Sequence, residues 1–556
     1  MEWWRVSLFV VLLLLALAHK QVFRLLRARS YGRGRRLRRS KRLGERQDLL
    51  TGGLLWGNAS LHESAATQHF LAAGVTGSGK SLVQRRLMKR VLTRLGHGSD
   101  SRVLLYDAKG DAAAFLARIN HRGPVYSLNP FESRTSNPQA VAWDVAADVT
   151  SPTDALNLAC SLIESEEGTN RYFSNAARLV VRAVVLSLIK HSAGKWTFAD
   201  LVQATTSRER LETVLCRDDF GKDALEGFLP DNNTGHCVAS TIYSNMVFYE
   251  ATAAQWQRVS GRLSLKHWLT DSSVLILGDN EAASASLEVM NRAMFRFLAE
   301  QIDVQSNSSS RRTWVWVDEL RLAKCLISSG KLTMLADKGR SRGVCLVLAF
   351  QDIEGFQEAA GTKLAGEIIA QCSNKALLRC QSKDSADWAS GLLGQYECLE
   401  VFRSDSSRLG SDESRSEQRV VKDAVLPSEF YELPVTSRAN GLTGYYITAE
   451  HGAHKTWVAP EELDAVVVPA EVERREAIRL RPANEQWLVA WEGKDLTRLG
   501  LHAKHSQEAA GTRQRQRLRL RKPSQAVTPP ASTGKVHVQV TDDGVLREVT
   551  LPKAVA

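Results

Sequence analysis

Eight residues in the first sixth of the chain have the types and spacing of a phosphate-binding loop. Positions 74–81 read Gly-Val-Thr-Gly-Ser-Gly-Lys-Ser, after a short strand-like run at 69–73 and before a helical pattern over 81–95. Glycines let the backbone turn its N–H groups inward, so that they surround a phosphate at the positive end of the following helix. The residues expected to bind phosphates are Gly74, Thr76, Gly77, Ser78, Gly79, Lys80 and Ser81.

Two of these side chains have specific expected roles. The Lys80 ammonium would bridge the β- and γ-phosphates of ATP, and the Ser81 hydroxyl would ligate Mg²⁺. A Gly-x4-Gly-Lys-Ser/Thr pattern arises by chance in roughly a few per cent of chains of this length. A flexible Gly/Ser turn is therefore the alternative unless a second signal is present.

The second signal is an apolar run followed by two acids. Positions 314–317 read Trp-Val-Trp-Val, without alternation, which is typical of a parallel strand buried on both faces. Asp318 and Glu319 follow at its carboxyl end, where parallel sheets bind ligands. Asp318 is expected to hold Mg²⁺ through water, and Glu319 to polarise the attacking water. The alternative is a solvated acidic pair at the end of a strand.

A third strand, expected at 344–350, completes the predicted site. Gln351 follows it and is placed to sense the γ-phosphate and report its hydrolysis. The preceding stretch 339–343 reads Gly-Arg-Ser-Arg-Gly, which puts Arg340 and Arg342 on one loop. Arg340 is expected to be an arginine finger for the ATP of a neighbouring subunit, with Arg342 as its competitor. A role for both as ordinary surface residues stays open.

The rest of the central chain predicts an α/β fold. Strand patterns alternate with helical ones, which indicates a mostly parallel sheet with helices on both faces. The phosphate-binding loop and the acidic pair lie much further apart in the sequence than a compact core requires, so an insertion is expected. At 151–262 helical periodicity replaces the strand signals, and we expect a small all-α domain there. Further strands are expected at 103–106, 125–128, 274–277, 376–380 and 445–448, and a helix at 287–302.

The amino terminus predicts a short membrane anchor. As a helix, the uncharged apolar run at 6–18 would reach about 20 Å into a hydrocarbon core roughly 30 Å thick, and Trp3 and Trp4 suit the interface. Residues 20–46 hold twelve Lys and Arg against one acid, and such flanks stay in the cytoplasm. We expect an anchor at 1–19, a basic juxtamembrane segment at 20–46 and a cytoplasmic body. A helix lying on the membrane surface and a cleaved signal peptide are the alternatives.

The net charge of +12 comes almost wholly from that basic segment, which leaves the remaining chain near neutral. A body that grips nucleic acid over its whole surface is therefore not predicted. The eight cysteines are scattered singly, which indicates reduced and mostly buried thiols. Two His-x-x-His pairs, at 451/454 and 502/505, have no Cys or carboxylate partners and are expected to be ordinary loop histidines rather than metal ligands.

Past residue 462 the sequence becomes polar, broken and charged. We expect a nucleotide-binding domain at 47–150 and 263–462, and a charged, partly disordered tail at 463–556. Within the tail, 513–522 places five arginines at every second position, which fits either a basic arm for nucleic acid or acidic membrane or a solvated tail. Residues 535–550 predict a small hairpin around Asp-Asp-Gly.

Taken together, these motifs resemble those of the type IV coupling proteins of conjugative DNA transfer. Members of this family are membrane-anchored RecA-like P-loop NTPases that form hexamers and bring relaxase-bound DNA to a secretion channel. The resemblance runs from about 68 to 458 and adds several short motifs to the two already described. These are Tyr-Asp-Ala-Lys-Gly-Asp at 106–111, Asn-Pro-Phe at 129–131, Trp-Asp at 143–144, Gly-Arg-Ser-Arg-Gly at 339–343, Gln-Asp at 351–352 and Gly-Leu-Leu-Gly at 391–394.

The resemblance implies ATP and Mg²⁺ as cofactors and a homohexamer in the bacterial inner membrane, with its body in the cytoplasm. The implied partners are DNA in a relaxosome, its relaxase, the channel proteins and the membrane, and the all-α domain would help to recognise DNA or relaxosome proteins. Many members carry two membrane spans around a small periplasmic domain, whereas one short apolar segment is visible here.

The leading hypothesis is an ATP-driven motor that moves DNA through the hexamer's central pore. A docking receptor for secreted protein substrates, with slow ATP hydrolysis, is the first alternative. A chromosome-segregation DNA translocase is the second, although such proteins usually carry several membrane spans and a terminal DNA-reading module, and the sequence shows neither.

Overall fold

The chain forms two units in the computed structural model. The larger unit lies within 1–501 and the smaller one within 502–556. In the smaller unit, β19 (Val538–Val540) pairs antiparallel with β20 (Leu546–Glu548), as the hairpin expected at 535–550 requires. The structure describes residues 31–39, 53–96, 98–131, 139–278, 283–404, 414–476, 483–501, 538–540 and 546–548. The anchor predicted at 1–19 and the arginine-rich stretch at 513–522 lie outside these residues.

The larger unit is built on one eleven-stranded sheet with the order β2-β18-β17-β14-β5-β13-β12-β6-β11-β7-β8. Neighbouring strands run parallel from β14 to β8, whereas β17 and β18 add antiparallel pairs next to β14. The mostly parallel sheet expected from the sequence is therefore confirmed. The strands are β2 (Arg38–Arg39), β18 (Gly452–Val458), β17 (Leu442–Thr448), β14 (Asn374–Leu377), β5 (Phe70–Ala73), β13 (Val344–Phe350), β12 (Arg312–Val317), β6 (Ser101–Asp107), β11 (Val274–Gly278), β7 (Val125–Ser127) and β8 (Gln139–Ala140).

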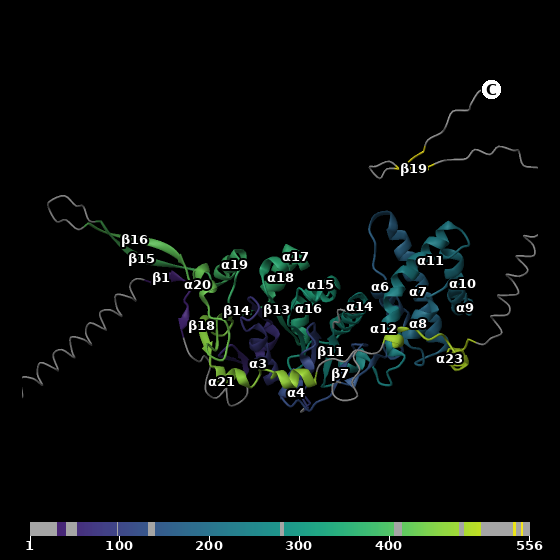
Figure 1. Cartoon of the computed structure of the whole chain (residues 1–556), viewed down its shortest axis with the longest axis horizontal. Coiled ribbons are helices and arrows are strands. Elements are labelled where there is room, and N and C mark those ends of the chain that lie inside the picture. The colour runs from purple at the N-terminus through teal and green to yellow at the C-terminus, as the bar shows by residue number, and fades with distance from the viewer. Residues whose placement is uncertain are drawn as a thin grey trace, which may run out of the picture. The chain divides into compact units, whose positions relative to one another are not determined.

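Helices cover both faces of the sheet (Figure 1). In β12, Trp314 and Trp316 stack with ring centroids 5.4 Å apart and pack into the core layer that contains α3. Val315 and Val317 face the opposite layer, which contains α14. The uninterrupted apolar run of this strand is thus explained by burial on both sides. The covering helices are α3 (Lys80–Leu92) and α4 (Ala112–Arg118) on one face, and α14 (Ser284–Asp303), α15 (Lys324–Ser328), α16 (Leu332–Asp337), α17 (Ile353–Ala360) and α18 (Thr362–Gln371) on the other.

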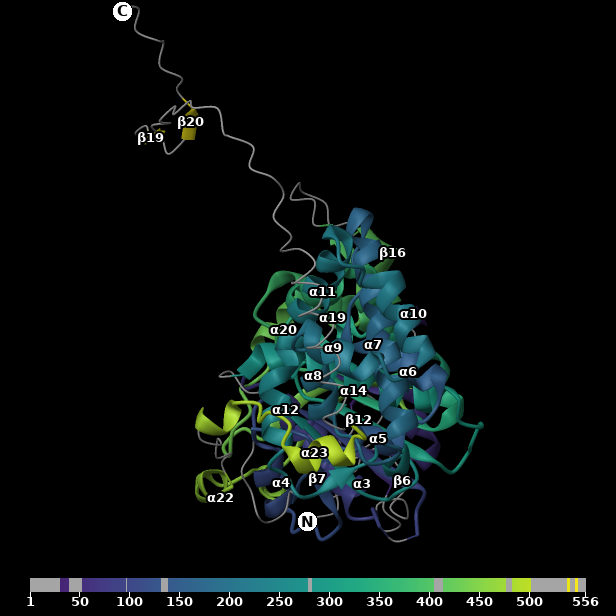
Figure 2. The same ribbon diagram turned by 90° about the vertical axis from the view of Figure 1, so that its right-hand side faces the viewer.

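Between α5 (Val145–Asp148) and β10 (Arg262–Leu263) the chain is helical and is described throughout (Figure 2). We call this stretch the helical insert, and it lies in the range where an all-α domain was expected. The strands that flank the insert in the sequence, β9 (Ala142–Trp143) and β10, pair in parallel, so the chain enters and leaves the insert at neighbouring positions. The helices are α6 (Pro152–Leu162), α7 (Arg171–His191), α8 (Phe198–Ala204), α9 (Arg208–Leu215), α10 (Asp219–Phe228), α11 (Asn233–Met246) and α12 (Glu250–Trp256).

Helix α7 is the core of the helical insert. Val180, Val181, Val184 and Leu188 on this helix are fully buried. Among the described residues it is also the one helix that is long and apolar enough to cross a membrane, but more than half of that segment is buried inside the protein. Its apolar character is accounted for by packing within the insert.

Part of the basic segment at 20–46 belongs to the fold. β1 (Tyr31–Gly34) pairs antiparallel with β15 (Gln395–Ser404), which in turn pairs with β16 (Ser414–Asp423). Arg33 forms an ion pair with Glu397 at 3.0 Å, and β2 extends the large sheet beside β18. The sequence indicated only a membrane-flanking role for this segment, because its strand partners are more than three hundred residues away.

Residues beyond 462 also differ from the expected tail, since they pack on the larger unit as far as Leu501. We call the described residues 460–476 and 483–501 the C-terminal strap. Its first part contains α21 (Pro460–Asp464) and α22 (Ala470–Arg475), and its second part α23 (Gly493–Arg498). Arg86 of α3 forms an ion pair with Glu462 at 2.8 Å, and Arg118 of α4 donates to the carbonyl oxygens of Asp464 and Val467 at 2.8 and 3.1 Å.

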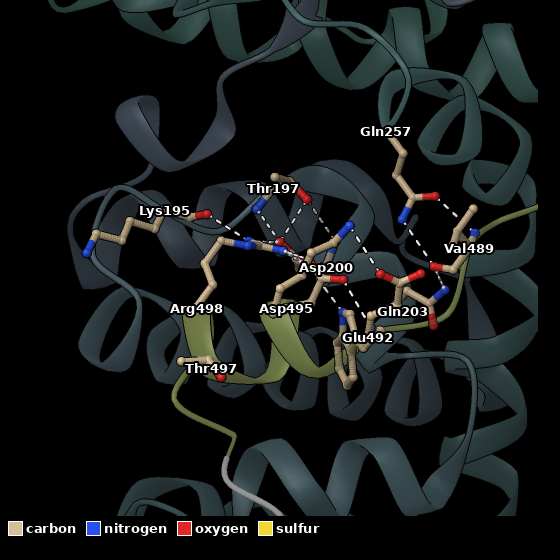
Figure 3. Close-up of polar contacts among 12 residues, drawn as sticks. Lys195, Thr197, Asp200, Gln203, Gln257, Val489, Glu492, Asp495, Thr497 and Arg498 are labelled. Carbon is tan, nitrogen blue, oxygen red and sulfur yellow. Dashed lines mark hydrogen bonds and ion pairs between the residues drawn. The ribbon is translucent and has the colours of Figure 1, made fainter.

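The second part of the strap is anchored on the helical insert by Asp200 of α8 (Figure 3). The buried Asp200 carboxylate accepts hydrogen bonds from the Arg498 guanidinium at 2.7 and 3.0 Å and from the Trp491 indole at 3.0 Å. The side chain of Gln257 exchanges two hydrogen bonds with the backbone of Val489, at 3.0 and 3.2 Å. The sequence predicted a solvated tail here because the residues that bind the strap, such as Asp200 and Gln257, lie more than two hundred residues earlier in the chain.

Replacing Arg498 with alanine is expected to loosen the strap. The change leaves the Asp200 carboxylate buried without its cation, which should cost about 1–3 kcal/mol, since the Arg498 side chain is 29% exposed and part of the effect is screened. Hydrogen exchange of the amides at 483–501 measures the loosening. Lys494→Ala is the control, because that side chain is 78% exposed and pairs with Glu492 at the surface. Equal exchange in both variants would contradict this role for the ion pair.

Candidate nucleotide site

The predicted phosphate-binding loop and acidic pair meet at one edge of the sheet. β5, β13, β12 and β6 are consecutive neighbours and run parallel, so the loops after their carboxyl ends lie side by side. These loops carry, in that order, the octet at 74–81, Gln351, the pair Asp318 and Glu319, and the segment 107–111. The sequence predicted a role in the site for three of the four, whereas the fourth was noted only as a motif of the family resemblance.

The phosphate-binding loop is shaped by its glycines and by a segment that lies more than 350 residues further along the chain. Gly77 and Gly79 have φ angles of 79° and 97°, which side-chain-bearing residues rarely adopt. A Cβ atom at Gly79 would also collide with Thr436 and Leu442. The Thr436 backbone N–H donates to the Gly77 carbonyl at 3.2 Å, and its hydroxyl donates to the Ser78 carbonyl at 2.8 Å. Glycine is therefore required here by both backbone conformation and close packing.

Lys80 lies at the start of α3 with its ammonium inside the loop. The residue is 6% exposed, and its Nζ donates to the carbonyl oxygens of Gly74 at 2.6 Å and Val75 at 3.3 Å. Burial lowers the pKa of Lys80, and the carboxylates of Glu319 and Asp318 oppose that shift. A buried ammonium held by two neutral carbonyls has much to gain from an anion, so the loop fits a phosphate.

Ser81 and Asp318 fit a magnesium ion. The Ser81 hydroxyl donates to both carboxylate oxygens of Asp318, at 3.1 Å each. Because its hydrogen points toward the carboxylate, the Ser81 oxygen keeps a lone pair for a metal. Hydroxyl and carboxylate oxygens are the ligands Mg²⁺ prefers, and it usually takes only one or two of them from the protein.

Glu319 is buried beside these groups, with 3% of the residue exposed. Burial raises the pKa of Glu319, whereas the Lys80 charge and the Gln351 amide lower it. The contact with Gln351 falls short of full hydrogen-bond geometry, since neither carboxylate oxygen has a partner by distance and angle among the described residues. Gln351 in turn accepts a hydrogen bond from the Thr76 hydroxyl at 3.1 Å, so it lies between the phosphate-binding loop and Glu319.

The two arginines of the 339–343 stretch lie away from these groups. They belong to the short helix η5 (Lys338–Arg342), which precedes β13, whereas Gln351 follows it. β13 has seven residues, so about 20 Å of strand separates the two ends. Arg342 forms an ion pair with Asp303 at 3.1 Å, whereas Arg340 is exposed and makes no ion pair with any described residue. The structure therefore does not bring either arginine to the nucleotide site of its own chain.

Lys109, for which the sequence predicted no role, lies in the site. Its ammonium forms a short ion pair with Asp318. Burial lowers the pKa of Lys109, but the Asp318 charge and the hydrogen bond to it raise the pKa above its usual value. The signal lay in the Tyr-Asp-Ala-Lys-Gly-Asp motif that follows β6. Only the pairing of β6 with β12 shows that this loop borders Asp318.

Asp107, at the end of β6, holds the Lys109 loop in place. Its carboxylate accepts hydrogen bonds from the backbone N–H groups of Asp111 and Ala112, at 3.1 and 3.0 Å, at the start of α4. Burial, together with the negative charge of Asp111, raises the pKa of Asp107 to about 6.

The fold and this site define a RecA-like P-loop NTPase. Residues 54–448 match the family model of the type IV secretion-system coupling protein DNA-binding domain. This match covers well over half of the chain, which therefore belongs to the type IV coupling protein family.

A related sequence and two solved structures are consistent with this family. The coupling protein TraD of Escherichia coli (strain K12) is 23% identical over 472 residues, which are 79% of this chain and 62% of TraD. The chain thus spans less than two thirds of that relative's length. An unbound structure of the bacterial conjugative coupling protein TrwB, in the form TrwBdeltaN70, has a TM-score of 0.59 at 20% identity and covers 78% of this chain and 96% of its own. TrwB in complex with ADP and Mg²⁺ has a TM-score of 0.59 at 19% identity, with 82% and 96% covered. At these identities the structures show the shared fold.

Asp107→Asn is expected to change how stability depends on pH. The folded chain holds the Asp107 proton up to about pH 6, whereas an unfolded aspartate releases it near pH 4. The stabilisation from this bound proton is complete at low pH and is lost as pH rises through 6. The native chain should therefore lose about 1–3 kcal/mol relative to Asp107→Asn between pH 4 and pH 7.

Unfolding temperatures of both proteins across this pH range measure the effect. Asp219→Asn is the control, because that side chain is 96% exposed and should leave the pH profile unchanged. Parallel profiles for the native chain and Asp107→Asn would show that Asp107 titrates normally.

Proposed function

We propose that this chain is a membrane-anchored hexameric ATPase that recruits relaxase-bound DNA to a type IV secretion channel and drives its transfer by ATP hydrolysis. The observation that carries the proposal is the convergence of Lys80, Ser81, Asp318 and Glu319 at one edge of the sheet. Membership of the coupling protein family supplies the transport role, and its family model describes a DNA-binding domain.

ATP and Mg²⁺ are the proposed cofactors. Solved TrwB complexes contain ADP with Mg²⁺ and the ATP analogue ADPNP, and the loop and hydroxyl–carboxylate pair of this chain fit both groups. The loop N–H groups and Lys80 would bind the phosphates, while Ser81 would ligate the metal and Asp318 would hold it through water; the bound metal neutralises phosphate charge. Glu319 is the base that polarises water, because a buried carboxylate with a raised pKa accepts a proton readily. Gln351 couples the state of the γ-phosphate to Thr76 and Glu319.

Arg340 is the proposed arginine finger, and it acts between subunits. It lies at the sheet edge opposite the nucleotide loops, so it can reach only the ATP of a neighbouring copy. Arg342 forms an ion pair with Asp303, which favours Arg340 over Arg342 as the arginine finger. A finger that acts between subunits requires a neighbouring copy of the chain, and the proposed hexamer provides one for every site.

The membrane location and the partners are proposed from the family. Residues 1–19 anchor the chain in the bacterial inner membrane, 20–46 flank the anchor, and the body lies in the cytoplasm. The nucleotide-binding domain comprises 47–150 and 263–462, and the all-α domain at 151–262, which contains most of the helical insert, meets relaxosome DNA, the relaxase or both. Channel proteins and the membrane are the remaining partners.

Glu319→Gln is expected to retain ATP binding and to lose turnover by about 10²–10⁴-fold, since it keeps the shape of the side chain but removes the base. Binding of ATP and hydrolysis with and without DNA are the measurements. Glu288→Gln, an exposed change on α14, is the control. Glu319 must be deprotonated to act as a base, and its pKa is raised. When the pH of the native protein is lowered, ATPase activity should therefore be lost at a higher pH than the usual Glu pKa of about 4.3 would give.

Two results would contradict the hypothesis of an ATP-driven motor. Native protein without any DNA-stimulated hydrolysis, together with normal transfer in a Lys80→Ala strain, would leave only a docking receptor for secreted proteins. Normal turnover in Glu319→Gln would place the base elsewhere.

Arg340→Ala is expected to bind ATP normally and to hydrolyse it at least about 10²-fold more slowly, whereas Arg342→Ala should mainly affect stability through Asp303. The two inactive variants Arg340→Ala and Glu319→Gln should regain activity when mixed, because an Arg340→Ala subunit with an intact site can receive a finger from a Glu319→Gln neighbour. ATPase assays of the mixture test this. The absence of rescue in assemblies shown to contain both variants would rule out a finger that acts between subunits.

A further inference from the structure

Lys109 is a second lysine in the nucleotide site, and the proposed function gives it no role. Its ion pair with Asp318 is the one ion pair of that carboxylate among the described residues. The Lys109 side chain is 40% exposed and that of Asp318 is 25% exposed, so the pair lies at the open side of the site. The same ammonium also influences the pKa values of Glu319 and Lys80.

The site needs a counter-ion at this position when no metal is bound. Asp318 and Glu319 are adjacent, and besides burial the negative charge of Asp318 contributes to the raised pKa of Glu319. Lys80 does not form an ion pair with either of them, since its ammonium donates to the carbonyl oxygens of Gly74 and Val75. The charge that neutralises Asp318 therefore comes from Lys109.

The backbone that carries Lys109 is held in place, while its side chain can move. The Asp107 carboxylate accepts the N–H groups of Asp111 and Ala112, and the Asp111 carboxylate forms an ion pair with Arg85 of α3 at 2.7 Å. Gly110 has a φ of 70°, which allows the tight turn between these contacts. The flexible stem of the lysine can thus swing its ammonium without rearranging the loop.

We propose that Lys109 is a displaceable counter-ion, which neutralises Asp318 in the nucleotide-free chain and leaves it when Mg²⁺ and nucleotide bind. This inference rests on the proposed function, in which Asp318 is the magnesium-binding carboxylate. The Ser81 hydrogen bond to Asp318 is compatible with a metal, because the hydroxyl oxygen retains a lone pair. The Lys109 contact is not, because an ammonium and a divalent cation repel each other strongly at such a short distance.

Lys109 is therefore a positioning residue that sets how readily the site accepts its metal. Its ammonium contacts the Asp318 carboxylate, which also accepts the Ser81 hydrogen bond. Mg²⁺ must compete with it for Asp318, so the ion pair raises the Mg²⁺ concentration that nucleotide binding requires.

The test is a Mg²⁺ titration of the binding of a fluorescent, non-hydrolysable ATP analogue. Lys109→Met should lower the half-saturating Mg²⁺ concentration about two- to fivefold, which is the size expected for a partly exposed ion pair. Lys109→Arg, which preserves the cation, should bind Mg²⁺ with close to native dependence. Lys331→Met is the matched control, because Lys331 forms an ion pair with Glu300 at 3.0 Å on the other side of the sheet.

A second measurement tests the contact itself in nucleotide-free protein. The rate at which an amine-reactive acetylating reagent labels Lys109 should rise in Asp318→Asn, whereas the labelling of Lys331 should not change. An unchanged or higher Mg²⁺ requirement in Lys109→Met would overturn the proposal, as would equal labelling of Lys109 in the native chain and in Asp318→Asn.

These readouts separate the two proposals, since neither depends on turnover. If the protein does not hydrolyse ATP but Lys109→Met shows the Mg²⁺ shift, the counter-ion proposal stands and the motor proposal fails. If the protein hydrolyses ATP through Glu319 but Lys109→Met shows no shift, the motor proposal stands and the counter-ion proposal fails.

Discussion

The parallel pairing of β5, β13, β12 and β6 is the constraint on which the rest of this structure depends. Parallel strands that are buried on both faces end at a common edge, so four loops from distant parts of the chain are forced together there. The stacked Trp314 and Trp316 and the valines between them hold β12 in this position. Without that burial, the acidic pair after β12 would be two ordinary surface carboxylates.

Charge balance at this edge accounts for the geometry of the site. Two adjacent carboxylates, Asp318 and Glu319, face two ammonium groups, Lys80 and Lys109, and each ammonium has a different partner. Lys80 is buried among loop carbonyls where a phosphate belongs, while Lys109 pairs with the carboxylate that suits a metal. Among the described residues, the position suited to the metal is thus neutralised by Lys109, whereas the Lys80 ammonium, at the position suited to a phosphate, contacts only neutral carbonyl oxygens.

The same edge is connected to the helical insert through the strap. α3 and α4 both begin at the nucleotide loops, and Arg86 and Arg118 on these helices hold the first part of the strap. The second part is fixed to the insert by Arg498 and Asp200. Elements next to the nucleotide and the helical insert therefore contact one and the same C-terminal segment.

The sequence by itself determined those parts of the protein whose signal is local. The octet at 74–81 predicts its strand, loop and helix because the conformational freedom of glycine and the phosphate chemistry lie within eight consecutive residues. The run at 314–317 predicts a doubly buried strand, and the loss of strand signals after 151 predicts helices. In each case the signal lies in the types and spacing of consecutive residues.

Tertiary structure decided whatever depends on pairing between distant segments. It showed that the loop of Lys109 borders Asp318, that Arg340 lies at the opposite edge from its own phosphate-binding loop, and that β1 and β2 belong to the fold. It also showed that the polar stretch beyond residue 462 is part of the larger unit, where Asp200 forms an ion pair with Arg498. A charged residue is solvated or structural according to its partner, and the sequence of one segment does not contain that partner.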